Sequence, residues 1–264
     1  MKLCCIKRID LTASIQQVGR PVAIMHRLYK FLLFHVLAFL GRNELGSAII
    51  DGKKALEKSM LYMASVQDYN GRHVCGGFLV SNNFVVTAAH CNVEMEKAMV
   101  VLGTHDLSRV EKTVKYIDKI FKHPSYKSDT RENNIMLLKL GGKDNWHFKG
   151  QPIQLPTSEK IINDKCSVAG WGFTESNKHT VNDLRVVDVC IINQDVCKKE
   201  SSGLPANVIC ADKGLCKGDL GGPLVCNGTA VGVASFYKNE VCDGPNVYTD
   251  ISKSLTWINK VLKK

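Results

Sequence analysis

The sequence predicts an all-β protein of antiparallel strands that ends in one helix. Short segments rich in β-branched and aromatic residues recur from residue 49 onward, separated by Gly, Asn and Pro, which is typical of strands joined by tight turns. A single helical pattern appears at the C-terminal end. With 264 residues, 45% of them hydrophobic, the chain is long enough to bury a sizeable core.

The strand pattern falls on residues 73–80, 82–89, 98–105, 134–140, 166–173, 184–192, 223–236 and 245–251. The segment 223–236 contains its own turn, because Asn227 and Gly228 tolerate the positive φ angles of a two-residue hairpin. Asn227 also begins an N-x-S/T sequon, so we expect glycosylation there if the protein is exported.

The helical pattern places four apolar side chains on one stripe and four lysines off it. The apolar set is Ile251, Leu255, Ile258 and Leu262, and the lysines are Lys253, Lys260, Lys263 and Lys264. Such a stripe usually docks on its own domain, and we favour that role. Binding to a membrane surface is the alternative for a basic amphipathic helix.

An export signal is predicted near the start of the chain. Arg27 and Lys30 precede the apolar run 31–40, and the small residues Gly46-Ser47-Ala48 follow. This order predicts a signal peptide over residues 25–48, with cleavage after Ala48 and an upstream extension, 1–24, absent from the mature protein. A buried helix is the alternative. The run is too short to span a bilayer. Eleven cysteines also suit an oxidising compartment, so we expect a secreted or granule protein.

The charge balance favours acidic partners. From residue 49 onward the chain carries 28 Lys and Arg against 23 Asp and Glu, a mildly basic excess without a nucleic-acid-binding signature. Residues 109–131 hold seven basic against three acidic residues. This run is a candidate surface for sulfated glycans or other acidic surfaces, although a solvated strand-and-loop face is the ordinary explanation.

Several motifs occur together and in order: Ile-Ile-x-Gly at 49–52, TAAHC at 87–91, GWG at 170–172 and GDxGGP at 218–223. With them the chain resembles the chymotrypsin-like serine protease family, and within it the granzyme and mast-cell protease group. The resemblance covers residues 49–264. It implies two six-stranded antiparallel β-barrels, roughly 49–150 and 151–264, a monomer, and no metal or cofactor.

The resemblance also assigns the catalytic positions, and two of them have lost their chemistry. His90 matches the general base. Asn134 stands where the family has the orienting carboxylate, and Leu220 stands where it has the nucleophilic serine. An amide holds the imidazole but favours the wrong tautomer. Leucine has no lone pair and no removable proton, so no acyl-enzyme can form. The oxyanion N–H groups would belong to Gly218 and Leu220.

Other serines do not replace the nucleophile. Ser235 matches the family serine that supports the orienting carboxylate and is expected behind the histidine. Ser201 and Ser202 lie in a loop far from the matching motif. Because a nucleophile must lie within hydrogen-bond reach of its base, we expect none of them to act.

Two further features follow from the resemblance. Ile49 would form the new N-terminus and pair its amine with Asp219. The specificity pocket would have Gly214 at its floor, while Tyr237 and Asn246 replace glycines on its walls and narrow it. Drift after loss of cleavage and a new ligand preference both account for these changes.

The resemblance pairs the cysteines as 75–91, 166–226, 197–210 and 216–242. Cys190 is left over in an apolar strand, where a buried, inert thiol is expected. Three functions stay open: a secreted, inactive homologue that acts by binding glycans, proteins or peptides; a serine endopeptidase, as family membership would imply; and a decaying product without a role.

Overall fold

The structure is a computed structural model that describes residues 52–109, 112–142, 150–158, 165–173, 179–200, 203–237, 242 and 244–264. The described residues belong to one compact unit. The predicted extension 1–24, the predicted signal peptide 25–48, Ile49, Ser201 and Ser202 lie outside these ranges. Within them, no helix is long and apolar enough to cross a bilayer.

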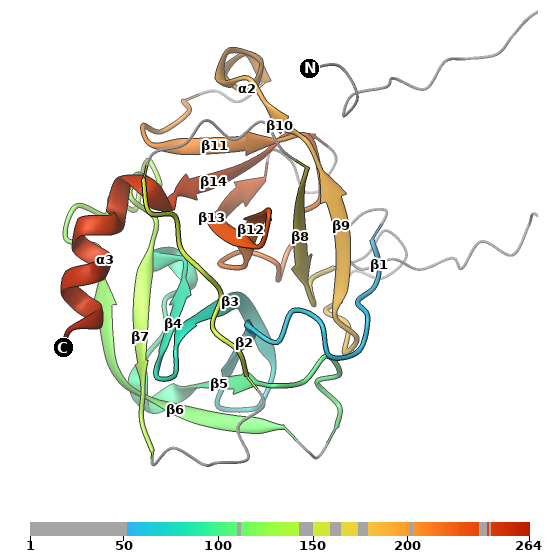
Figure 1. Cartoon of the computed structure of the whole chain (residues 1–264), viewed down its shortest axis with the longest axis vertical. Coiled ribbons are helices and arrows are strands. Elements are labelled where there is room, and N and C mark those ends of the chain that lie inside the picture. The colour runs from blue at the N-terminus through green and yellow to red at the C-terminus, as the bar shows by residue number, and fades with distance from the viewer. Residues whose placement is uncertain are drawn as a thin grey trace, which may run out of the picture. The chain divides into compact units, whose positions relative to one another are not determined.

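The N-terminal half forms a closed antiparallel barrel, drawn in cyan to green in Figure 1. Around the barrel the strands follow the order β2 (Met63–Asp68), β3 (His73–Ser81), β4 (Phe84–Thr87), β7 (Met136–Leu140), β6 (Thr113–Lys122) and β5 (Ala98–Leu102). This confirms the first predicted barrel. The sequence pattern did not mark β2 or β6, because β2 buries the polar Ser65 and Gln67 and β6 is mostly exposed and charged.

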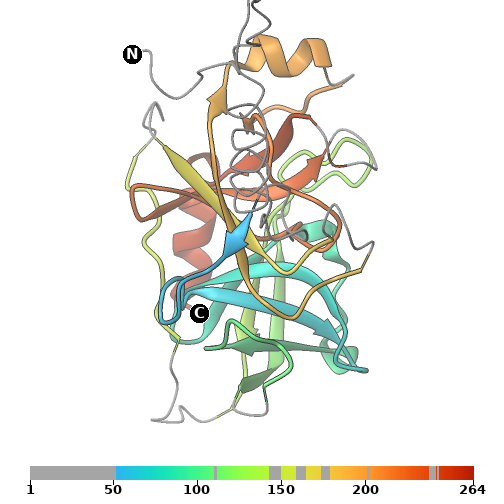
Figure 2. The ribbon, with the colours of Figure 1, turned by 90° about the vertical axis from the view of Figure 1, so that its right-hand side faces the viewer.

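The C-terminal half is an antiparallel sheet of eight strands. Their order is β1 (Lys53–Lys54), β9 (Arg185–Val189), β8 (Cys166–Gly170), β12 (Pro223–Cys226), β13 (Thr229–Tyr237), β14 (Asn246–Asp250), β11 (Val208–Ala211) and β10 (Ile191–Ile192). Figure 2 shows these mainly orange and red strands above the cyan and green ones.

The count differs from the six strands expected, for a local reason. Cys190 alone separates β9 from β10, so one run of chain pairs with β8 through β9 and with β11 through β10. Cys190 itself continues the pairing, because its N–H donates to Asp212 Oδ1 and its carbonyl accepts from the Asp212 N–H. The two-residue β1 adds the remaining strand at the edge of β9. The sheet therefore curls round to a barrel whose sixth strand is bent at Cys190.

A shared core lies between the two halves. It combines residues of the first barrel, such as Phe78 and Leu137, with residues of the second, such as Val233. The short η3 (Ile251–Ser254) and α3 (Leu255–Leu262) add Ile251, Ile258 and Val261 to the same cluster. The C-terminal helix is thus present where predicted, and its apolar stripe docks on the protein's own core.

The remaining elements are short. They are η1 (Ala89–Cys91), η2 (Met95–Lys97) and α2 (Gln194–Glu200). The sequence did not predict α2, because this helix buries Cys197 while its Val196 is 47% exposed, and no apolar stripe results. The predicted hairpin turn is confirmed: Asn227 and Gly228 have φ angles of 49° and 75°, between β12 and β13.

Candidate functional site

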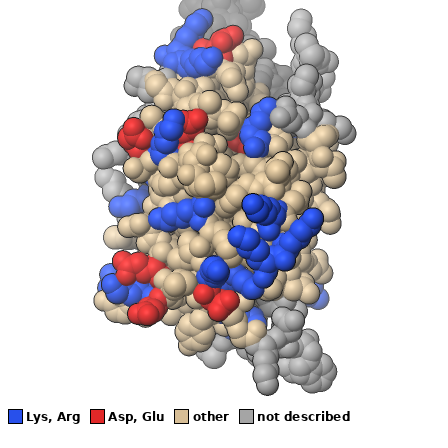
Figure 3. All heavy atoms as spheres, turned by 90° about the vertical axis from the view of Figure 1, so that its left-hand side faces the viewer, with Lys and Arg blue, Asp and Glu red and all other residues tan. Residues whose placement is uncertain are grey.

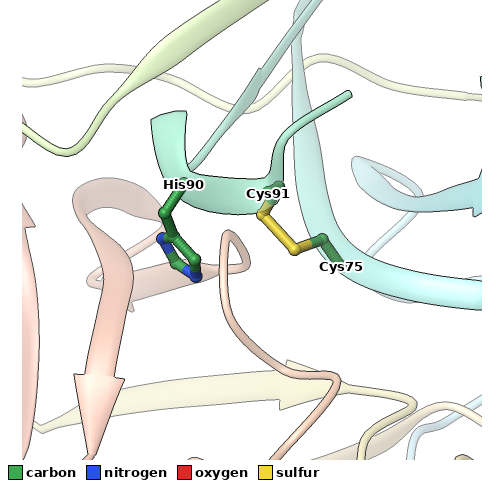
Figure 4. A group of neighbouring side chains, drawn as sticks. All are labelled: Cys75, His90 and Cys91. Atoms are coloured by element: carbon green, nitrogen blue, oxygen red, sulfur yellow. A yellow bond between two sulfur atoms is a disulfide. The ribbon is translucent and has the colours of Figure 1, made fainter. Parts of the chain in front are cut away.

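The candidate site begins at the turn η1, which carries His90 between the buried Ala89 and the disulfide-bonded Cys91. Figure 4 shows the His90 ring beside the Cys75–Cys91 bond. These three side chains bring donor atoms within 4.8 Å of one another. The two sulfur atoms are bonded to each other, however, so they are not thiolate ligands for a metal.

Asn134 is fully buried just before β7 and makes three contacts with His90. Its Oδ1 accepts a hydrogen bond from the His90 backbone N–H at 3.0 Å, and its Nδ2 lies 2.8 Å from His90 Nδ1. Nδ2 also donates to Ser235 Oγ, 2.7 Å away in β13. Ser235 is 1% exposed, so its hydroxyl lies behind Asn134 and is not available as a nucleophile.

These contacts favour one tautomer of His90. Turning the amide of Asn134 over would place its NH₂ group against the His90 backbone N–H, so Oδ1 must occupy that position. The shorter contact of Nδ1 is then with the donor Nδ2, although Oδ1 also lies 3.2 Å away. Nδ1 accepts, and the single proton of the neutral ring sits on Nε2.

The ring is held in the neutral form. Burial lowers the pKa of His90 to about 4, and the positive charge of Arg131 adds to this. The hydrogen bond that Nδ1–H of the charged ring would donate to Asn134 Oδ1, 3.2 Å away, opposes the lowering. A general base needs a free Nε2 lone pair facing the nucleophile. In this chain a neutral ring presents an N–H there instead.

Leu220 occupies the loop between β11 and β12, half-buried against the core of the second barrel. Its carbonyl accepts from the Gly76 N–H at 2.8 Å and lies 4.0 Å from Cys91 Sγ. Gly221, with φ of 88°, packs so closely on Thr87 and Ala88 that an added Cβ would lie 2.3 Å from Thr87 Oγ1. The loop therefore lies directly against the segment that carries His90.

Asp219 stabilises this loop from the interior of the protein. It is 1% exposed, and its two carboxylate oxygens accept from the N–H groups of Gly172, at 2.8 Å, and Cys216, at 3.0 Å. Burial raises the pKa of Asp219 to about 7, against the effect of both hydrogen bonds. Its predicted partner Ile49 lies outside the described residues.

The residues of the predicted specificity pocket lie together. Gly214 has φ of 116°, and an added Cβ would lie 2.8 Å from Val168. Asn246 is fully buried, and its Oδ1 accepts from the Leu215 N–H at 2.6 Å while its Nδ2 donates to Gly244 O at 3.2 Å. Leu215 is itself 2% exposed. Tyr237 is half-buried at the end of β13.

The sequence pattern did not indicate one further histidine, His73, which supports the loop at Gly218. His73 is buried in β3, its Nε2 donates to the Gly218 carbonyl at 2.8 Å, and its Nδ1 lies 2.7 Å from Ser65 Oγ. Burial lowers the pKa of His73 to about 4, so the ring is neutral. The signal was available: His73, Ser65 and Gln67 are polar residues at inward positions of two apolar strands.

The cysteines follow the predicted pairs with one correction. The bonds Cys75–Cys91, Cys166–Cys226, Cys197–Cys210 and Cys216–Cys242 are all present. Cys190 was expected as a buried thiol, and this was wrong, because it is also disulfide-bonded. Cys190 is half-buried at a bend between two strands, so its sulfur is accessible to a second cysteine. The sulfur of a fully buried strand residue would not be.

A β-barrel pair with a histidine between the halves defines the class of the chymotrypsin-like proteases, and comparison with known proteins agrees. The sequence model of the family described as Trypsin matches residues 49–258, so the chain belongs to the trypsin family. It is 37% identical to duodenase-1 of Bos taurus and 36% identical to granzyme B of Rattus norvegicus, over 88% of this chain in both cases and 96% and 99% of those proteins.

Further similarities point to the same group. Mast cell protease 3 of Ovis aries is 37% identical over 89% of this chain and 96% of its own length. Among solved structures, neuropsin, a serine protease expressed in the limbic system of mouse brain, superposes with a TM-score of 0.72 at 30% identity, covering 81% of this chain and all of that one. The protein is therefore a trypsin-like family member of the granzyme and mast-cell protease type.

Proposed function

We propose that this protein is a secreted, catalytically inactive member of the trypsin family that acts by binding. The observation that carries the proposal is the side chain of residue 220. Acyl transfer begins with an oxygen that loses its proton to the histidine. Leu220 supplies only carbon atoms at that place, and the nearby hydroxyl of Ser235 is buried and bonded to Asn134.

The geometry of the histidine supports the same conclusion. In this family an amide in place of the orienting carboxylate lowers turnover by about 10⁴-fold, because the imidazole takes the wrong tautomer. The contacts of Asn134 favour that tautomer here. The binding of substrate and the oxyanion hole alone leave only about 10³ to 10⁴ over the uncatalysed rate, which is too little for a working protease.

Secretion is supported by the cysteines. Four described disulfides, together with the bonded Cys190, need an oxidising compartment to persist. Asn227 is exposed on its hairpin turn, where a glycan can be attached. If the protein is exported from expressing cells, removing N-glycans should increase its mobility on a gel, and Thr229→Ala should abolish that change.

A fluorophosphonate probe tests inactivity directly, because it reacts only with an activated hydroxyl. The purified native protein should remain unlabelled under conditions that label trypsin completely. Covalent labelling, with the modified residue located by mass spectrometry, would establish a serine endopeptidase and overturn the proposal.

A second binding role concerns acidic surfaces, and the distribution of lysines supports it. Figure 3 shows Lys and Arg gathered on the face that carries α3, β6 and β7. Lys119 and Lys139 are directly paired across β6 and β7, an arrangement of like charges that costs stability. The Nζ atoms of Lys119 and Lys264 both lie 5.4 Å from the ring of Phe121, and Lys139 Nζ donates to the Lys264 carbonyl at 3.1 Å.

This Lys119–Lys139–Lys264 cluster differs in part from the run 109–131 that the sequence suggested. Arg109 lies within 3.6 Å of Glu57, and Lys127 lies 2.7 Å from Glu132, so these cations are already paired. We therefore propose the lysine cluster as the contact for sulfated glycans. Retention on a heparin column at physiological salt is expected, and passage without retention would remove this role.

A further inference from the structure

The candidate site presents hydrogen-bond donors where an active protease presents both a donor and an acceptor. His90 is the first donor, since its Nδ1 accepts from Asn134 Nδ2 at 2.8 Å and its proton lies on Nε2. Leu220 supplies no acceptor in front of it. Any group that binds there must therefore accept.

Two backbone N–H groups are the other donors. The Lys217 carbonyl accepts from the Phe173 N–H at 2.7 Å, and the Asp219 carbonyl accepts from the Gly222 N–H at 3.1 Å. In a trans peptide the N–H points opposite to the carbonyl, so the N–H of Gly218 points away from Phe173 and that of Leu220 away from Gly222. Within the described ranges, neither N–H has a hydrogen-bond partner.

The loop is fixed in this orientation from behind. His73 Nε2 donates to the Gly218 carbonyl at 2.8 Å, and the Asp219 N–H donates to the Cys216 carbonyl at 3.0 Å. The Asp219 carboxylate faces inward, where the N–H groups of Gly172 and Cys216 bind it. Arg131 is the charged group whose field reaches His90. The charge of Arg131 therefore favours an anionic ligand beside the ring.

We propose that this site binds the free C-terminal carboxylate of a peptide. One oxygen lies between the N–H groups of Gly218 and Leu220, and the other accepts from Nε2–H of His90. An internal peptide bond fits less well, because its second polar group is an N–H that would face the N–H of His90. The inference rests on the proposed function, since the peptide must not be cleaved, and it involves no bond making or breaking.

The last residue of such a peptide must be small. Asn246 Oδ1 is joined to the Leu215 N–H at 2.6 Å, and both residues are buried. Asn246 is a predicted pocket position and Leu215 follows the predicted floor residue Gly214, so we expect these side chains to leave less room for a substrate side chain. Glycine or alanine at the C-terminus therefore suits the site better than an aromatic or basic residue.

The test compares two ends of one peptide on the full chain. The probes are fluorescein-labelled tetra-alanine with a free C-terminal carboxylate and the same peptide as its C-terminal amide, measured by fluorescence anisotropy from pH 5.5 to 8.5. We expect the acid to bind at least tenfold more tightly than the amide at pH 5.5, where His90 is neutral and Asp219, with a pKa of about 7, is protonated. Equal affinities, or no binding of the acid at millimolar concentration, would overturn the inference.

Asn134→Asp tests the role of the tautomer. An aspartate accepts from Nδ1–H, so Nε2 of the neutral ring presents a lone pair to the ligand. The affinity for the acid should fall at least tenfold at pH 8 and recover as the ring becomes protonated. Asn92→Asp is the matched control: it adds the same charge at the exposed end of the η1 turn and should keep the affinity and the pH profile of the native protein.

¹⁵N chemical shifts of the His90 ring provide a readout independent of affinity. They should show the proton on Nε2 in the native protein and on Nδ1 in Asn134→Asp, and the proton on Nδ1 in the native protein would contradict the inference. Fluorophosphonate labelling separates the two proposals. Loss of peptide binding without labelling removes only this inference, whereas labelling or cleavage of the peptide removes the proposed function as well.

Discussion

At the scale of single residues, positions 134 and 220 differ in how much of their surroundings survive. Asn134 keeps the partners that a carboxylate would have, because Oδ1 accepts from the His90 N–H and Nδ2 donates to Ser235 Oγ, from which a carboxylate would accept. Leu220 keeps its backbone bond from Gly76 while its side chain packs on apolar neighbours. The first substitution preserves the arrangement of the site, and the second removes a reactant.

Restoring both residues should restore reactivity. Leu220→Ser alone provides a hydroxyl but leaves His90 in the wrong tautomer, so we expect fluorophosphonate labelling about 10⁴-fold slower than with the second change, Asn134→Asp. Labelling rates of the single and double variants, measured on protein released at Ile49, check this. Asn134→Asp alone serves as the control and should remain unlabelled.

Asp219 should make stability depend on pH. Its pKa is about 7 in the folded chain against 3.8 for the free group, so the folded state binds the proton more tightly. The stability from Asp219 is present below pH 3.8 and is lost as pH rises to about 7. His73 and His90, with pKa values of about 4, act in the opposite direction between pH 6.5 and 4, so a difference measurement is needed.

The free energy of unfolding of Asp219→Asn minus that of the native chain should therefore increase by about 4 kcal/mol between pH 4 and 8. Denaturant titrations of the chain retaining its upstream segment measure it. The exposed Asp188→Asn should give a difference that does not change with pH in this way. If the difference in free energy of unfolding between Asp219→Asn and the native chain does not change with pH, a cation in the folded chain neutralises the Asp219 carboxylate.

Much of the site could be predicted from residue types in order, because the motifs around His90, Asn134 and Leu220 each occur once. The tautomer needed the coordinates: only the bond from the His90 N–H fixes which way the amide of Asn134 faces. The role of His73 was equally hidden, since its partner Gly218 lies 145 residues away in the sequence.

At the scale of elements, the C-terminal helix α3 connects the halves. Ile258 and Val261 are 0% and 3% exposed in the core that both barrels share. The pattern of apolar residues predicted this helix well, whereas α2 and the charged strand β6 were missed. Both lack a continuous apolar face. Pairing with β5 and β7 holds β6, and the Cys197–Cys210 disulfide joins α2 to β11.

Ile258→Ala should destabilise the protein by about 2–4 kcal/mol, because it removes buried methyl groups and leaves a cavity. Thermal or denaturant unfolding measures the loss. Lys263→Ala, at an exposed position after the same helix, should change the free energy of unfolding by less than about 0.5 kcal/mol. Similar effects of the two variants would show that the helix is not docked in solution.

At the scale of the whole molecule, the positive charge is distributed unevenly. Lys54, Lys97 and Lys165 each pair with an acidic side chain. Lys119 and Lys264 instead lie over the ring of Phe121, and Lys139 donates to the main-chain oxygen of Lys264. Among the described residues, no Asp or Glu forms an ion pair with these three lysines. The sequence showed the excess of charge, but only the fold shows which lysines gather on one face.

Replacing Lys119, Lys139 and Lys264 together by alanine should lower the salt concentration needed to elute the protein from heparin. The paired lysines Lys54, Lys97 and Lys165, replaced together by alanine, remove the same charge and should shift elution much less. Equal shifts would mean that net charge, and not this cluster, determines binding.

The contacts of Asn134 have a consequence for how this protein could have changed over time. The residue belongs to the first barrel, yet its side chain bonds to Ser235 and its carbonyl to Thr249, both in the second. An uncharged residue of the same shape as aspartate keeps these contacts between the halves, whether or not the protein hydrolyses peptides. Selection for folding alone is then enough to retain an asparagine here. A position kept for these contacts accepts fewer residue types than a position kept only for catalysis would accept once catalysis no longer matters.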